Sequence, residues 1–178
     1  ALMRQGFVIS FPRRIVEVRH DERPGAARRE IEHRTAALAS MDLFASLTDA
    51  ERASLARQLT TSPYVAGERI FEASQPADSL YLLAQGHVEI IRERDKGGLA
   101  VKLATLEAPA YFGEMGLLLG QPRIATVAAV DDALCYRLDK RGFDSILRGR
   151  PALAEALARI LAERQAENDA KLQALDAE

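Results

Sequence analysis

The sequence predicts a mainly β domain, a sandwich or jelly-roll barrel, with helices on either side of it. Three observations support this fold class: short strand-like segments between 62 and 138, turn signals that separate them at nearly regular spacing, and helical patterns before and after this region. The predicted strands are 65–71, 80–83, 88–92, 100–106, 126–130 and 134–138, with turns at 66–67, 85–86, 96–98 and 131–132.

Helices are predicted on both flanks of the strand-rich region. Before it, Thr48 and Glu51 have the spacing of a capping box, and Leu55 and Leu59 follow at four-residue spacing. After it, Pro151 suits the first turn of a helix that continues in alanine, leucine and charged residues. We therefore expect C-terminal helices over about 139–176.

The first forty residues divide into two segments. Residues 6–18 are rich in β-branched side chains and predict a strand, in which Pro12 indicates an edge or a bend. Residues 21–40 are charged and alanine-rich, and they predict a helical linker. The main domain is therefore expected over 41–178, with 1–20 as a separate strand segment.

Composition limits the classes of function. The chain has 178 residues, of which 48% are hydrophobic, which suffices for one sizeable core. A formal net charge of −2 gives no electrostatic case for nucleic acid. The single cysteine, Cys135, cannot form an internal disulfide and indicates a reducing compartment. Because the sequence opens with Ala1 and has no apolar run of ~20 residues, we expect a membrane connection only through segments upstream of it.

Residues 112–127 carry the residue types of a phosphate site. Gly113 lets the backbone approach a ligand closely, and 114–119 can form a short helix whose first N–H groups favour a phosphate. The guanidinium of Arg123 can bind two phosphate oxygens at once. Glu114 is a poor partner for phosphate but a good acceptor for a sugar hydroxyl. This combination predicts a nucleotide pocket; the alternative is a solvated ion pair between Glu114 and Arg123 on a Gly/Pro-rich turn.

The string FGEMGLLLGQPRIATV at 112–127 resembles the phosphate-binding cassette of cyclic-nucleotide-binding domains. The resemblance covers roughly 41–167. It implies an antiparallel β-roll (a jelly-roll, or double-stranded β-helix) with an N-terminal helical bundle and a C-terminal hinge or lid helix. The residues that match the cassette are Phe112, Gly113, Glu114, Met115, Gly116, Leu117, Leu118, Pro122, Arg123, Ala125 and Thr126.

The resemblance also implies a role for each site residue. Arg123 would bind the cyclic phosphate and Glu114 the ribose 2′-hydroxyl, while Arg164, on the C-terminal helix, would contact the adenine base. For Arg164 the alternative is that it ends an apolar stripe and points into water. The full expected ligand set is Phe112, Gly113, Glu114, Met115, Arg123, Ile124, Ala125, Val101, Leu103, Leu161 and Arg164.

Ile124 bears on ligand choice. Members of the family that select cGMP often carry threonine directly after the arginine, whereas Ile124 has no hydroxyl. We therefore expect cAMP to be preferred and cGMP to bind more weakly; if Ile124 only packs in the strand, both nucleotides would bind. The dispersed histidines show no metal-ligand spacing and no nucleophile-and-base pair stands out, so neither a metal nor catalysis is expected.

The segment 6–18 resembles the last strand of the cytoplasmic domain in the small-conductance mechanosensitive channel family. Together with the cassette, this implies a bacterial cyclic-nucleotide-gated channel, a heptamer in the inner membrane with this domain on its cytoplasmic face. The alternative is a soluble cAMP-binding regulatory protein or kinase-type regulatory subunit. A third interpretation is that the cassette binds no nucleotide and the domain acts only as a scaffold. The presence of both Glu114 and Arg123 argues against this interpretation.

Overall fold

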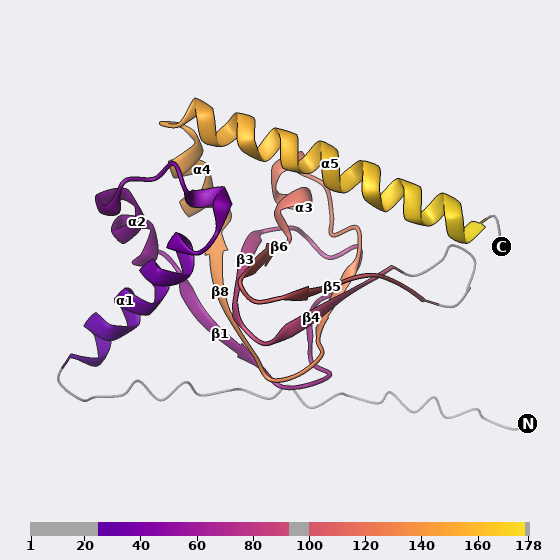
Figure 1. The fold of residues 1–178 in the computed structure, drawn as a ribbon, viewed down its shortest axis with the longest axis horizontal. Coiled ribbons are helices and arrows are strands. Elements are labelled where there is room, and N and C mark those ends of the chain that lie inside the picture. Colours follow the sequence, from indigo (N-terminus) through magenta and orange to yellow (C-terminus); the bar gives the residue numbers. More distant parts are fainter. Residues whose placement is uncertain (1–24, 93–99, 177–178) are drawn as a thin grey trace, which may run out of the picture.

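Two four-stranded antiparallel sheets form a roll in the computed structural model, which describes residues 25–92 and 100–176 (Figure 1). The strand orders are β1-β8-β3-β6 and β2-β7-β4-β5. The predicted mainly β fold, an antiparallel roll with flanking helices, is confirmed. The strands are β1 (Thr60–Tyr64), β2 (Arg69–Phe71), β3 (Ser79–Gln85), β4 (His87–Arg92), β5 (Val101–Glu107), β6 (Ala110–Phe112), β7 (Thr126–Ala129) and β8 (Ala133–Asp139).

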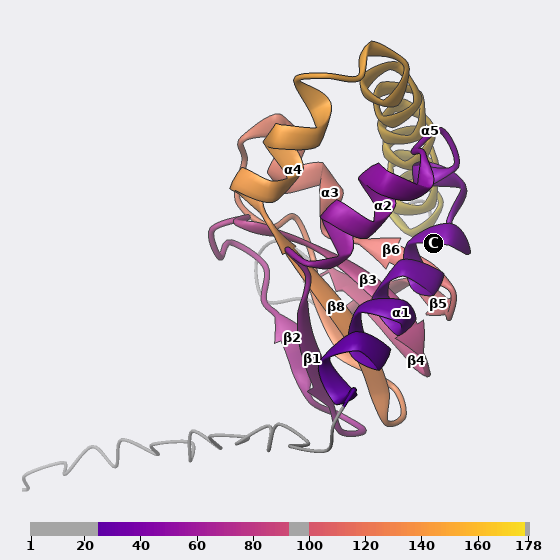
Figure 2. The same cartoon turned by 90° about the vertical axis from the view of Figure 1, so that its left-hand side faces the viewer.

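Helices pack against one side of this roll. In Figures 1 and 2, α1 and α2 lie together at one end, and α5 runs across the roll past α3. No helix in the described part of the chain is both long enough and apolar enough to cross a membrane. The helices are α1 (Ala26–Ala39), the 3-10 turn η1 (Asp42–Phe44), α2 (Asp49–Ala56), α3 (Glu114–Leu119), α4 (Lys140–Leu147) and α5 (Pro151–Asp176).

Strand β3 separates the two halves of the core. Its side chains alternate in direction, so Leu80 and Leu82 face the helices while Tyr81 and Leu83 face the interior of the roll. Both faces are buried, which explains the continuous apolar run in this strand. The helix-side core also receives Leu38, Phe44, Leu55, Phe143, Leu153 and Leu157.

The predicted capping box at the start of α2 is confirmed. Glu51 N–H donates to Thr48 Oγ1 at 3.4 Å, and the Thr48 N–H donates to Glu51 Oε2 at 2.9 Å. The same carboxylate accepts from Arg150 Nε at 3.0 Å. These hydrogen bonds, Arg150 first, lower the pKa of Glu51 to about 2. One carboxylate therefore joins the start of α2 to the residue that precedes α5.

The prediction of a single strand over 65–71 is wrong. The chain turns between β1 and β2, where Gly67 has a φ of 80° and the Glu68 N–H donates to the Val65 carbonyl. Strand β1 contains Pro63, which is tolerated because β1 lies at the edge of its sheet. Strand β6 was not predicted. The expected strand at 6–18 lies outside the described residues, and the domain boundary at 41 stays a prediction, although Leu38 of α1 is fully buried.

Candidate functional site

A tight turn joins β6 to α3, at the point where the sequence predicted a close backbone approach. Gly113 adopts a φ of 85°, which side-chain-bearing residues rarely take. A Cβ atom there would lie 2.7 Å from Nη1 of Arg123. The predicted short helix follows as α3, and Gly120, with a φ of 65°, ends it. The start of α3 leaves backbone N–H groups without intrahelical acceptors.

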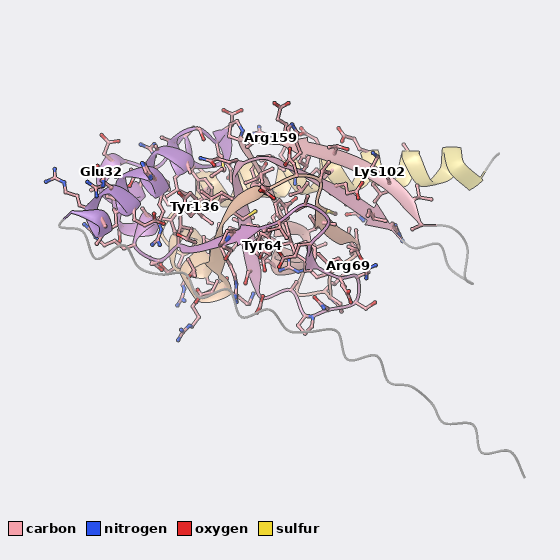
Figure 3. All side chains as sticks on the ribbon, turned by 90° about the horizontal axis from the view of Figure 1, so that it is seen from below. Glu32, Tyr64, Arg69, Lys102, Tyr136 and Arg159 are labelled. Atoms are coloured by element: carbon pink, nitrogen blue, oxygen red, sulfur yellow. The ribbon has the colours of Figure 1, made fainter. Side chains whose placement is uncertain are left out.

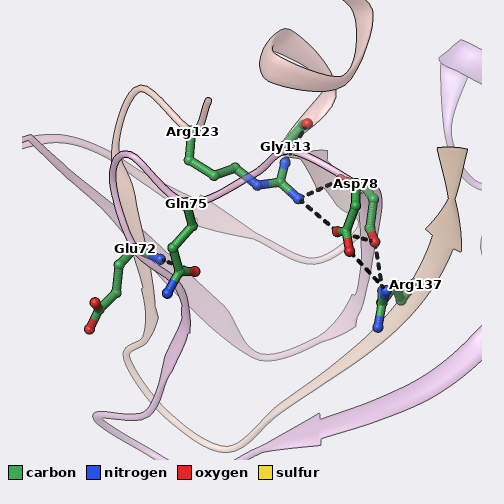
Figure 4. Close-up of polar contacts among 7 residues, drawn as sticks. Glu72, Gln75, Asp78, Gly113, Arg123 and Arg137 are labelled. Atoms are coloured by element: carbon green, nitrogen blue, oxygen red, sulfur yellow. Dashed lines mark hydrogen bonds and ion pairs between the residues drawn. The ribbon is translucent and has the colours of Figure 1, made fainter. Parts of the chain in front are cut away.

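The guanidinium of Arg123 lies behind this turn. Its Nη1 donates to the Gly113 carbonyl at 2.7 Å and its Nη2 to the Ser79 carbonyl at 2.8 Å (Figure 4). The group also lies over the Phe71 ring, 4.2 Å from its centre. Only 5% of Arg123 is exposed, and its Nε, among the described residues, is buried without a hydrogen-bond partner. The site therefore holds a buried cation whose Nε–H has no hydrogen-bond acceptor within the described residues.

An acidic residue directly before β3 and a second arginine on β8 lie near Arg123. Asp78 Oδ1 lies 3.9 Å from Arg123 Nη2, and Asp78 Oδ2 lies 3.4 Å from Nη2 of Arg137 (Figure 4). Arg137 Nε donates to Ser79 Oγ at 2.6 Å. Burial lowers the pKa of Arg123 below its usual high value, and arginine remains charged at neutral pH. Sequence reasoning did not assign Asp78, Ser79 or Arg137 to the site, because their sequence spacing gives no sign of this contact.

Glu114 lies at the first position of α3 and is 1% exposed. Its Oε1 is 2.5 Å from Nη1 of Arg164, which comes from α5. Both terminal nitrogens of Arg164 donate to the Tyr111 carbonyl at 3.3 Å, and its guanidinium lies 4.6 Å from the centre of the Tyr111 ring. The surface ion pair between Glu114 and Arg123, which was the alternative to a nucleotide pocket, does not form, since both residues are buried. Glu114 pairs with Arg164 instead, and Glu114 and Arg123 are the buried charged residues in the described part of the chain.

A cavity of about 130 Å³ brings most of the predicted site residues together. Val101 is not among its lining residues, and Leu161 lies outside the described side chains. Within the described residues no group of His, Cys, Asp and Glu could hold a metal ion. The lining residues predicted from sequence are Leu103, Phe112, Gly113, Glu114, Met115, Arg123, Ile124, Ala125 and Arg164; the others are Phe71, Ile90, Ala104, Leu106, Gly116, Val127 and Glu167.

The cavity is lined by two chemically different polar groups. Arg123 suits an anionic phosphate, and the Glu114 carboxylate at the start of α3 suits a hydroxyl. Apolar side chains such as Leu103 and Ile124 line the space around them. The fold and site thus define a ligand-binding β-roll domain with the polar groups that a nucleotide requires.

Residues 61–150, half of the chain, match the family described as the cyclic nucleotide-binding domain. The chain belongs to this family, and as such is a cyclic nucleotide-binding regulatory domain.

Solved structures of related proteins have the same fold. The Thermus thermophilus catabolite activator protein is 33% identical, with a TM-score of 0.66 over 75% of this chain and 62% of that one. The regulatory domain of Toxoplasma gondii PKA, solved with cAMP, is 22% identical, with a TM-score of 0.72 over 78% and 52%. A cAMP-binding acyltransferase from Mycobacterium smegmatis is 28% identical, with a TM-score of 0.61 over 78% and 42%. The chain spans about half the length of such proteins.

Proposed function

We propose that this domain senses a cyclic nucleotide, with cAMP preferred over cGMP, and regulates an effector attached to it. The observation that carries the proposal is Arg123, a buried cation with an unpartnered Nε that lines the same cavity as the buried carboxylate of Glu114. A cyclic phosphate would supply the acceptor for the first group and a ribose hydroxyl the donor for the second. Two of the similar structures are described as bound to cAMP or cAMP-binding, which supports this choice of ligand.

Calorimetric titration of the chain with cAMP and cGMP tests the proposal directly. Truncation of a buried charged partner costs ~2–5 kcal/mol, so we expect Arg123→Ala to weaken cAMP binding roughly 30- to 5,000-fold. Arg141→Ala is the matched control, because Arg141 is exposed on α4 and distant in sequence from the cavity lining. If Arg123→Ala changes affinity by less than about threefold, Arg123 is not the phosphate ligand.

Helix α5 is the proposed moving part. A sensor needs two states that its ligand binds unequally, and packed sheets deform less easily than a docked helix. Leu153 and Leu157 bury the first half of α5 in the core, while Arg164 reaches the cavity. The ion pair between Arg150 and Glu51 would convey a shift of α5 to α2, and from there towards the N-terminus. No catalytic step is part of this proposal.

For the effector, we propose an ion channel of the mechanosensitive superfamily, a heptamer in the bacterial inner membrane with this domain on its cytoplasmic face. The support is the resemblance of 6–18 to the last cytoplasmic strand of that family. Two measurements on the protein encoded by the complete reading frame test this: its mass in detergent and its ion conduction in response to cAMP. A heptamer that conducts ions in response to cAMP is expected; a soluble protein without apolar helices upstream of Ala1 would favour a soluble regulator instead.

A further inference from the structure

The backbone of Arg123 is held by a turn that lies outside the cassette. Arg123 is part of the irregular segment between α3 and β7, so no helix or strand fixes its main chain. Its N–H donates to the Gln75 carbonyl at 2.8 Å, and its carbonyl accepts from the Ser74 N–H at 2.8 Å. Both main-chain groups of the proposed phosphate ligand are therefore bonded to the turn at 72–75, far earlier in the chain.

This turn has a conformation that its surroundings must stabilise. Ser74 adopts a φ of 68° and is the one non-glycine residue with a positive φ among the described residues. Two side chains support the turn. Oε1 of Gln75 accepts from the Glu72 N–H at 3.0 Å (Figure 4), and Oγ1 of Thr126 accepts from the Ala73 N–H at 3.1 Å. Each side chain thus satisfies one backbone donor of the turn.

Thr126 connects the turn to the roll. It is buried and begins β7, which pairs with β2 and β4. Phe71, the last residue of β2 and the residue directly before the turn, packs against the Arg123 guanidinium. Strand β2 and its turn therefore contact both the side chain and the main chain of Arg123. Because a guanidinium presents its donors in a fixed planar fork, a small shift of the main chain would misalign that fork with a bound phosphate.

We infer that Thr126 and Gln75 are positioning residues for phosphate recognition, which hold the turn at 72–75 and through it the main chain of Arg123. The inference rests on the proposed function, in which Arg123 binds the cyclic phosphate. Neither Thr126 nor Gln75 is among the residues that line the cavity. Their effect on a ligand is therefore exerted through Arg123.

The first test uses amide hydrogen exchange on the ligand-free protein, followed by NMR. Thr126→Val keeps the shape of the side chain but removes its hydroxyl, and Gln75→Ala removes the other acceptor. We expect each variant to raise exchange at the amides of Ser74 and Arg123 about tenfold, the size of one lost hydrogen bond. Thr126→Ser retains the hydroxyl and should exchange as the unmodified chain does.

Arg69→Ala is the matched control for the turn. Arg69 lies on the surface (Figure 3), and its Nη1 forms an exposed ion pair with Oε1 of Glu72, in the same turn, at 2.8 Å. Exposed ion pairs contribute little to stability, so this variant should leave the exchange at 74 and 123 unchanged. Unchanged exchange in both Thr126→Val and Gln75→Ala, or an equal rise in Arg69→Ala, would overturn the inference, whatever the ligand is.

The second test separates phosphate from ribose recognition. The probes are cAMP, its two phosphorothioate analogues, in which sulfur replaces one exocyclic phosphate oxygen, and 2′-deoxy-cAMP. We expect Thr126→Val to weaken cAMP binding about tenfold and to reduce the preference for cAMP over the weaker-binding phosphorothioate at least about threefold. The preference for cAMP over 2′-deoxy-cAMP should stay within about twofold, because Glu114 is unchanged. Thr126→Ser should restore both the affinity and the phosphate preference.

The outcomes of this titration are distinct. Weaker cAMP binding with both preferences unchanged would overturn the inference, because a variant that only lowers the folded fraction weakens all these nucleotides equally. Unchanged cAMP binding in Thr126→Val and Gln75→Ala would also overturn it. Absence of cAMP binding in the unmodified chain would reject the proposed function, and the exchange measurement would still decide whether these two side chains hold the main chain of Arg123.

Discussion

At the scale of single residues, the expected preference for cAMP over cGMP rests on Ile124. It lines the cavity directly after Arg123 and is 38% exposed, so its side chain is not buried in strand packing. A hydroxyl at this position could accept a hydrogen bond from the guanine amino group, and isoleucine has no hydroxyl.

We therefore expect Ile124→Thr to improve cGMP binding relative to cAMP by about 3- to 10-fold, as for one neutral hydrogen bond. Parallel titrations of both nucleotides measure the ratio. Ile124→Val, which removes bulk without adding a hydroxyl, should leave the ratio unchanged. An unmodified protein that prefers cGMP would contradict the interpretation of Ile124.

His87 and Asp131 form a second pair of chemical interest, at the turns that join β3 to β4 and β7 to β8. His87 Nδ1 lies 2.6 Å from Asp131 Oδ2, and Glu107 Oε1 lies 3.8 Å from Nε2. The hydrogen bond that His87 donates to Asp131 raises the pKa of His87, and the same bond lowers the pKa of Asp131.

The pH dependence follows from these directions. His87 stabilises the fold fully below its unfolded pKa of about 6.5, and this contribution is lost as the pH rises through the raised pKa. Asp131 contributes above about pH 4 and loses its contribution as the pH falls through its lowered pKa. We expect urea unfolding to show the pair's largest effect between about pH 4 and 6.5. Asp131→Asn should remove the decline in the free energy of unfolding above this pH window. The same decline in the unmodified protein and the variant would contradict the assignment.

At the scale of elements, α3 packs unusually close to the segment before β3. A Cβ atom at Gly116 would lie 2.6 Å from the Cβ of Ala77 and 2.9 Å from the Gln121 carbonyl. Alanine is the better helix former by ~1 kcal/mol, but overpacking typically costs ~1–3 kcal/mol. The steric cost of the added Cβ atom should therefore outweigh the gain in helix propensity.

We expect Gly116→Ala to lower the free energy of unfolding by about 1–2 kcal/mol and to weaken cAMP binding, because α3 must shift. Chemical denaturation and calorimetry measure the two effects. Ala77→Gly removes one of the two clashing atoms, so the double variant should be more stable than the sum of the single changes predicts. Strict additivity would show that Ala77 is not the obstacle.

The elements also show what could be predicted from sequence. Strands with apolar runs, the capping box at Thr48 and the short helix at 114–119 were predictable because their signals are local. Strand β1 was missed because Ser62 and Pro63 interrupt the strand-favouring Thr and Tyr residues around them, and only its edge position makes Pro63 acceptable. The cassette at the site was predictable, but the Glu114–Arg164 pair was not. Those residues are fifty positions apart, and only the path of α5 across the roll brings them together.

At the scale of the whole molecule, ligand binding should be visible as stability. A ligand that binds only the folded state at 100 times its dissociation constant adds about 2.7 kcal/mol. For a chain of this size, that corresponds to a rise in Tm of roughly 5–11 °C. We expect this rise with cAMP in a thermal scan of the unmodified chain, and no rise for Arg123→Ala at the same concentration. An equal rise in both would mean that cAMP binds elsewhere.

Cys135 gives the molecule a practical property. It is the single cysteine of the chain, fully buried inside the roll, and burial raises the pKa of its thiol to about 12. At neutral pH almost none of it is thiolate, which is the reactive form. A cysteine introduced at an exposed site on α1 and another on α5 would thus accept maleimide dyes without removal of the native one. Energy transfer between two such dyes would follow the distance between these helices in solution as nucleotide is added.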